Sequence, residues 1–207
     1  GMHSSQNEQD SRHYAIAAKL PMLEPADAGE SLSFTKLAYE ISEKYDTPVF
    51  IKMCTRVAHS QSVIETSDRE ETSKTYEKDG AKYIMMPGNA KRRHPIVEAR
   101  TAALTEYAET APFNRIEDGS DHSIGIITSS TSYQYAKEVC SDKYPVLKIG
   151  MINPLPIKKI QEFAKSVDKV IVIEELDGII ETHCRSIGVD VTGKELFSCI
   201  DELSQNI

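Results

Sequence analysis

The fold is decided by four short apolar runs, rich in β-branched residues: IGIIT (124–128), VLKIG (146–150), VIVI (170–173) and VDV (189–191). Three segments lie between these runs and place their apolar residues three or four positions apart, as one face of a helix does: 132–140, 157–167 and 180–187. Short apolar strands need cover on both faces of a sheet, and helices with one apolar stripe supply that cover. This stretch therefore predicts a small, mainly parallel sheet with right-handed crossover helices.

A second β-α-β unit is predicted earlier in the chain. Asp27 and Glu30 form a capping-box pattern, and apolar residues then recur at helical spacing until 46–48 ends the helix. Other elements are expected around this helix: a short helix at 14–18, an extended piece at 22–24, a strand at 49–53, an exposed excursion at 62–79, a strand at 81–86, a helix from Pro95 to Ala111, and a linker at 114–123. Together these features predict an α/β protein of two small domains, 1–118 and 119–207.

The composition is that of an acidic globular chain. Its 207 residues are 40% hydrophobic and 27% charged, with a formal net charge of −8. This charge argues against a nucleic-acid surface, despite the basic run KRRH at 91–94. No apolar run approaches the roughly 20 residues that a membrane helix needs. The four cysteines lack metal-binding spacing, so we expect free thiols in a reducing cytoplasm and no membrane partner.

Two candidate binding residues follow the predicted strand at 49–53. Arg56 and His59 come just after its carboxyl end, where ligands bind in open α/β sheets. A guanidinium group can bind a carboxylate through two hydrogen bonds, so an anionic substrate is one interpretation. Structural roles are an equal alternative, with Arg56 pairing with a local carboxylate and His59 capping a turn.

Other polar residues have simpler interpretations. The hydroxyl-rich turn Ser129–Ser132 could hold a phosphate at a helix N-terminus, but it lacks both glycine-rich nucleotide motifs, so we favour Ser132 as a helix cap. Glu174 and Glu175 end a strand without an identifiable partner, and we expect them to be solvated or bound to a helix N-terminus. His183 lies on an apolar helix face and is expected to be a core residue with its hydrogen bonds satisfied. The six histidines show no paired spacing for a metal ion.

Longer motifs carry a resemblance to a known family. They are HSSQNEQDSRHYA (3–15), SEKYDTPVFIKMCTRVAHSQSVIE (42–65), KIGMINPLPIKKIQEFA (148–164) and VIVIEELDGIIE (170–181). In this order, the chain resembles the alpha subunits of 2-oxoacid:ferredoxin oxidoreductases of the indolepyruvate type, which use thiamine diphosphate. The likeness extends over nearly all of the chain.

The resemblance implies an internal fragment of a longer subunit. Residues 1–118 would be the latter part of a pyrimidine-binding-type domain with its linker helix, and residues 119–207 a transketolase C-terminal-like domain. The complete enzyme would oxidatively decarboxylate aryl 2-oxoacids to acyl-coenzyme A. It would use thiamine diphosphate, Mg²⁺ and iron–sulfur clusters, with coenzyme A, ferredoxin and a beta subunit as partners in an oligomer. The parts that hold these cofactors are not recognisable in this sequence, so the fragment itself is expected to be inactive and without cofactor.

The resemblance also implies where this chain meets the active site. No catalytic residue is expected in it, but one loop would line the active-site mouth: His3, Ser4, Ser5, Gln6 and Asn7. Arg56 and His59 would lie near the substrate carboxylate or a partner surface. The alternative is a non-catalytic assembly or coenzyme A binding module of another 2-oxoacid oxidoreductase or dehydrogenase, for which the turn Ser129–Ser132 is the one coenzyme A feature.

Overall fold

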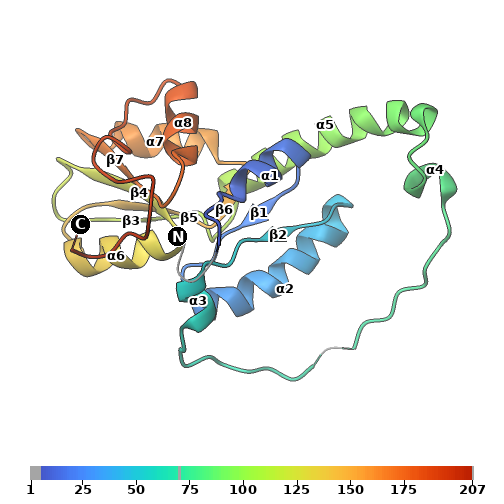
Figure 1. Ribbon diagram of the computed structural model, residues 1–207, viewed down its shortest axis with the longest axis horizontal. Helices are drawn as coiled ribbons and strands as arrows, with labels where there is room; N and C mark the ends of the chain where they lie inside the picture. The colour runs from blue at the N-terminus through green and yellow to red at the C-terminus, as the bar shows by residue number, and fades with distance from the viewer. Residues whose placement is uncertain (1–5, 70, 207) are drawn as a thin grey trace.

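The computed structural model describes residues 6–69 and 71–206 and is a mixed α/β fold with two sheets (Figure 1). The larger sheet has the strand order β3-β5-β4-β7: β3 (Arg115–Glu117), β5 (Val146–Ile149), β4 (Gly125–Ser129) and β7 (Val170–Ile173). β4 is parallel to both β5 and β7, whereas the edge strand β3 is antiparallel to β5. The predicted mainly parallel sheet is therefore confirmed.

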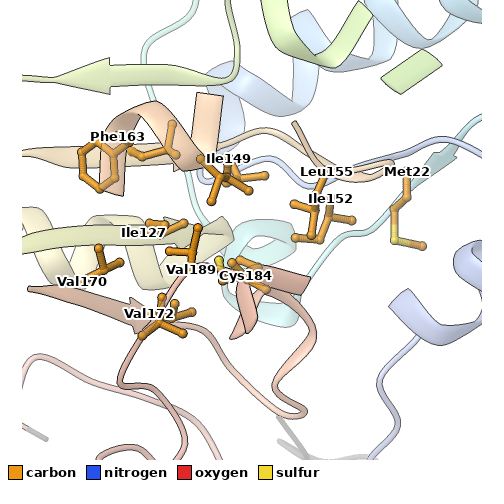
Figure 2. Packing of buried hydrophobic residues seen from close by; sticks show 14 of the residues in the cluster. Met22, Ile127, Ile149, Ile152, Leu155, Phe163, Val170, Val172, Cys184 and Val189 are labelled. Carbon is orange, nitrogen blue, oxygen red and sulfur yellow. The ribbon is translucent and has the colours of Figure 1, made fainter. Parts of the chain in front are cut away.

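Helices cover both faces of the larger sheet. On one face, α6 (Ser130–Cys140) packs Ala136 against Ile126 and Val146. On the other, α7 (Ile157–Lys165) and α8 (Ile179–Ser186) contribute buried residues such as Phe163 and Cys184 to the main core (Figure 2). Each large apolar side chain that is fully buried in this way contributes about 1.5–3 kcal/mol. The three amphipathic segments of the sequence therefore fold as predicted.

The smaller sheet has β1 (Met22–Leu23) at its centre. β1 is parallel to β2 (Phe50–Ile51) and antiparallel to β6 (Met151–Asn153). α1 (Arg12–Ala18) precedes β1, and α2 (Ala28–Tyr45) lies between β1 and β2. The predicted capping box of α2 forms with one change of partner. Glu30 N donates to Asp27 Oδ1 at 2.8 Å, but Glu30 Oε2 accepts from the backbone N–H of Ala26, at 2.8 Å, instead of that of Asp27.

The two sheets are joined through Gly150. β5 ends at Ile149 and β6 begins at Met151, so the chain passes from the larger to the smaller sheet within one residue. Asn114 Oδ1 accepts from the backbone N–H groups of Gly150 at 2.8 Å and Met151 at 3.0 Å. A Cβ atom at Gly150 would lie 2.8 Å from Phe113 O, so only glycine fits this close approach. Each sheet contains strands from both sides of residue 118.

The structure between residues 61 and 110 agrees with one prediction and differs from two. The excursion is confirmed, because the described residues of 61–79 are all exposed and lie outside helices and strands. The predicted strand at 81–86 is wrong: Asp79 caps α4 (Gly80–Tyr83) by accepting from two of its backbone N–H groups. α5 (Pro87–Thr110) begins at Pro87, eight residues before the predicted start. Pro95 lies inside α5, in a largely exposed half where water can bond the carbonyl group that proline leaves without a donor.

Two further expectations are corrected. The predicted linker at 114–123 begins with buried Asn114 and includes β3, because the carboxamide of Asn114 and pairing with β5 fix this part of the backbone. The predicted strand at 189–191 is reduced to one parallel bridge between Ile171 and Thr192. Immediately after it the chain turns toward α8, where Lys194 N donates to Glu181 Oε2 at 2.9 Å. Within the described residues, no helix is long and apolar enough to cross a bilayer.

Candidate functional site at the strand ends

Charged and hydroxyl side chains gather where strands of both sheets end. Glu24 follows β1, Lys52 follows β2, Ser129 ends β4 and Glu174 follows β7. Lys52 Nζ lies 2.5 Å from Glu24 Oε1, and Ser129 Oγ donates to Glu24 Oε2 at 2.6 Å. Glu24 and Glu174 are each only 1% exposed. Ligands bind outside the carboxyl ends of strands in open α/β sheets, so this edge is the candidate site.

Arg12 connects the N-terminal segment to the end of β7. Its guanidinium donates to Glu174 Oε2 at 2.6 Å and to Asp10 Oδ2 at 2.5 Å. It also donates to the carbonyl groups of Glu175 at 2.8 Å and Asp177 at 2.7 Å, and the whole residue is 2% exposed. We call Asp10, Arg12, Glu24, Lys52 and Glu174 the buried charge cluster. It holds the segment before α1 against the edge of the larger sheet.

Glu174 has a second role at the start of α8. Its two carboxylate oxygens accept from the backbone N–H groups of Ile180 and Glu181, each at 3.0 Å. One of the two sequence-based interpretations of Glu174, a carboxylate bound to a helix N-terminus, is therefore confirmed. Glu175 accepts from Leu203 N at 3.3 Å, so the C-terminal segment also contacts this edge.

Burial and pairing set the charge states of the cluster. Burial raises the pKa of Glu24, but Lys52 and Arg12 outweigh this effect, and the pKa lies below its usual value. Burial lowers the pKa of Lys52, but Glu24 outweighs it, and the pKa is raised. Glu24 and Lys52 therefore form a charged pair at neutral pH. At Glu174, burial dominates and holds the pKa above its usual value despite Arg12.

The predicted loop residues lie next to this cluster in sequence. Gln6 and Asn7 are exposed and lie just before Asp10 and Arg12, which the cluster holds in place. His3, Ser4 and Ser5 lie outside the described residues. The role of this loop at an active-site mouth stays a prediction.

Arg56 and His59 lie on α3 (Thr55–His59), just past β2. Both are exposed. Arg56 Nη2 lies 2.7 Å from Glu202 Oε2, and its guanidinium carbon is 5.9 Å from the centre of the Tyr135 ring. Arg56 therefore pairs with a carboxylate, as its structural alternative predicted, but the partner is distant in the sequence rather than local. The helix cap is Ser60 rather than His59, so the capping alternative for His59 is wrong.

The hydroxyl turn faces the interior. α6 begins at Ser130, so Ser132 lies within the helix and is not its cap, which corrects our favoured interpretation. All four residues of Ser129–Ser132 are buried. Ser130 Oγ donates to Pro25 O at 3.4 Å, and Thr131 Oγ1 accepts from Cys54 Sγ at 3.8 Å. The hydroxyl groups of Ser129, Ser130 and Thr131 thus bond to the protein, which leaves the coenzyme A interpretation without geometric support.

The buried charge cluster was not predicted, although the sequence carries one signal for it. Lys52 is a lone charge in the apolar run VFIKM (49–53), and such a charge must be paired if the strand is buried. Its partner Glu24 lies 28 positions away in the sequence. No spacing rule connects the two residues.

The cluster does not fit thiamine diphosphate. A diphosphate needs unpaired cations or free N–H groups, and Mg²⁺ needs several oxygen ligands. Arg12 and Lys52 are already bonded to carboxylates. Among the described residues, Asp10, His13 and Asp177 place possible metal-ligand atoms close to one another. However, Asp10 is already paired with Arg12.

The chain is similar in sequence to several known proteins that share one name. No family model matches the chain. Proteins named indolepyruvate oxidoreductase subunit IorA are 36% identical over 200 residues in Archaeoglobus fulgidus, 36% over 205 in Methanothermobacter thermautotrophicus and 31% over 220 in Thermococcus kodakarensis. These alignments cover 93%, 93% and 98% of this chain but 32%, 33% and 34% of the relatives. The chain thus spans about one third of their length.

A solved structure shows the same fold. It is a 2-oxoglutarate:ferredoxin oxidoreductase from Magnetococcus marinus with 2-oxoglutarate, coenzyme A and succinyl-CoA bound. The similarity has a TM-score of 0.55 at 15% identity and covers 92% of this chain and 40% of that one. From the sequence relatives and this fold together, the chain belongs to the family of the indolepyruvate oxidoreductase subunit IorA and corresponds to about one third of that subunit.

Proposed function

We propose that this chain is part of the alpha subunit of an enzyme that oxidatively decarboxylates aryl 2-oxoacids, such as indolepyruvate, to acyl-coenzyme A. Ferredoxin accepts the electrons, and a beta subunit completes the cytoplasmic enzyme. The observation that carries the proposal is similarity to IorA proteins over 93–98% of the chain. The fold shared with a 2-oxoglutarate:ferredoxin oxidoreductase supports it.

In this proposal the chain supplies the structure beside the reaction centre. Thiamine diphosphate, Mg²⁺ and the iron–sulfur clusters are proposed to be held by other parts of the longer subunit, of which this chain spans about one third. The loop His3–Asn7 is proposed to line the active-site mouth, and Arg12, bonded to Asp10 and Glu174, holds in place the segment that follows this loop in the sequence. Residues 1–118 act as the pyrimidine-type part and residues 119–207 as the transketolase C-terminal-like part.

Arg56 is the residue of this chain that we propose to lie near the substrate carboxylate. It follows a strand end, and it can exchange Glu202 for a substrate anion because both side chains are accessible, at 49% and 22% exposure. His59, on the same short helix, faces the substrate or a partner subunit.

The proposal is tested with the full-length subunit purified together with its partner subunit. We expect reduction of ferredoxin that depends on both indolepyruvate and coenzyme A. Arg56→Gln should raise KM for the 2-oxoacid by on the order of tenfold, the value of a lost charged hydrogen bond. Arg92→Gln is the matched control. Arg92 is exposed in the N-terminal half of α5, and its loss should leave KM unchanged. Failure of every aryl 2-oxoacid to reduce ferredoxin contradicts the proposal.

Isothermal titration calorimetry tests whether this chain by itself binds the cofactor. The 207-residue chain should bind thiamine diphosphate weakly or not at all in the presence of Mg²⁺. Micromolar binding would show that this chain contains the cofactor site after all.

A further inference from the structure

The C-terminal segment 198–206 crosses the edge that carries the candidate site. It lies outside helices and strands, yet Leu203 is only 4% exposed. The backbone N–H of Leu203 donates to Glu175 Oε1 at 3.3 Å, just past the end of β7. The backbone N–H of Asp201 donates to Glu8 Oε2 at 3.4 Å, in the segment before α1. The C-terminal segment therefore connects two sides of the candidate site.

Glu202 connects the same segment to a third side, formed by α3. Its Oε2 atom lies 2.7 Å from Arg56 Nη2. The Arg56 side chain is 49% exposed, so a molecule in solvent can reach its guanidinium group. Glu202 thus places a carboxylate of the protein on the arginine that we propose to lie near the substrate carboxylate.

Arg56 has a second support in Tyr135. The Tyr135 ring belongs to α6, and its centre lies 5.9 Å from the guanidinium carbon, within the range of attraction between a cation and an aromatic ring. This contact does not involve Glu202, so it persists when Glu202 leaves. A carboxylate that replaces Glu202 therefore meets a guanidinium that is already positioned, and the two groups match in hydrogen-bond geometry.

The contact between Arg56 and Glu202 is weak enough to exchange. Ion pairs at a protein surface are favoured over their separated forms by a factor of about 1.4–5, because water screens both charges. A ligand that binds only the separated form loses affinity in proportion to the fraction of that form. The loss for a ligand of Arg56 is then about two- to sixfold.

We propose that the C-terminal segment is a latch that regulates the substrate site: Glu202 occupies Arg56 in the absence of substrate, and the carboxylate of a 2-oxoacid displaces it. The inference rests on the proposed function, because it takes Arg56 as the residue that binds the substrate carboxylate. Glu202 raises KM for the 2-oxoacid about two- to sixfold and leaves kcat unchanged. Substrate binding removes one attachment of the segment and so loosens the backbone at 201–203.

Glu202→Gln in the full-length subunit, purified with its partner subunit, tests the competition. The amide keeps the shape of the side chain but carries no charge, so KM for indolepyruvate should fall about two- to sixfold at unchanged kcat. With Arg56→Gln already in place, Glu202→Gln should have no effect on KM, because no guanidinium remains to be occupied. Glu195→Gln, at an exposed position just before the segment, is the matched control and should leave KM unchanged.

Hydrogen exchange in the same protein tests the latch itself. Saturating indolepyruvate should speed the exchange of the amide protons of residues 201–203 by up to about fivefold, the factor of one lost surface ion pair. Glu202→Gln should cause this increase without substrate, and substrate should then add nothing to it.

The outcomes separate the latch from the proposed function. If Arg56→Gln raises KM and Glu202→Gln does not lower it, the latch is overturned while the substrate role of Arg56 stands. A fall in KM that persists with Arg56→Gln overturns the latch as well, because Glu202 then acts on another group, and so does exchange at 201–203 that substrate leaves unchanged. If no aryl 2-oxoacid reduces ferredoxin, the proposed function fails, and the latch fails with it.

Discussion

Replacement of Arg12 by methionine should destabilise the whole chain. Methionine keeps most of the length of the side chain but removes its bonds to Asp10, Glu174 and two carbonyl groups. Removal of one partner of a buried ion pair costs about 3–5 kcal/mol, because the other charge stays buried without compensation. Glu174 keeps its bonds to the N–H groups of Ile180 and Glu181, so we expect the lower end, about 3 kcal/mol.

Urea unfolding followed by far-ultraviolet circular dichroism measures this cost, provided that the slope m is unchanged. Lys19→Met is the matched control. Lys19 pairs with Glu98 at the surface, where the two side chains are 42% and 45% exposed, and its loss should cost less than about 1 kcal/mol. Adding Glu174→Gln to Arg12→Met removes one of the two buried carboxylates that lose their partner, the other being Asp10, and should restore about 1–2 kcal/mol. Our reasoning about the cluster is refuted if Arg12→Met costs no more than Lys19→Met.

Three other perturbations give simpler tests. The pKa of His183 is lowered in the folded state, so protons bind preferentially to the unfolded chain and stability should fall as pH drops through about 6.5. His183→Gln should flatten this part of the urea-midpoint-against-pH curve, and an unchanged slope would contradict the assignment. A Cβ atom at Gly125 would lie 2.8 Å from Val167 Cγ2, so Gly125→Ala should lower stability by about 1–3 kcal/mol in thermal unfolding. Gly88→Ala, with nothing within 4 Å, should have no such cost. Limited trypsin digestion should first cut the segment 61–79, whose described residues are all exposed, and an early cut elsewhere would argue that this segment is packed.

Periodicity predicted the larger sheet well because its signals are local. The runs around Ile126, Leu147 and Val172 are short, apolar and β-branched, and each helix between them carries one apolar stripe. The resemblance in motif order likewise predicted the family, which similarity to the IorA proteins confirms.

The errors arose where tertiary contacts determine the structure. β3 forms because β5 offers a free edge, and nothing in the polar sequence around Arg115 signals this pairing. Pro95 resembles a helix start, but the preceding turns of α5 form anyway because Pro87 provides an equally suitable first residue. The buried charge cluster could not be predicted for the same reason, since Arg12 and Glu174 lie 162 positions apart.

The one-residue passage from β5 to β6 limits how independently the two sheets can move. Any displacement of Met151 relative to Ile149 must be absorbed at Gly150, whose backbone is hydrogen-bonded to Asn114 and Glu24. Hinge motion between the sheets is therefore restricted, and a force applied to either one reaches the other through continuous backbone. We expect the slowest-exchanging amide protons of β1 and β5 to exchange at the same rate, in a single cooperative opening.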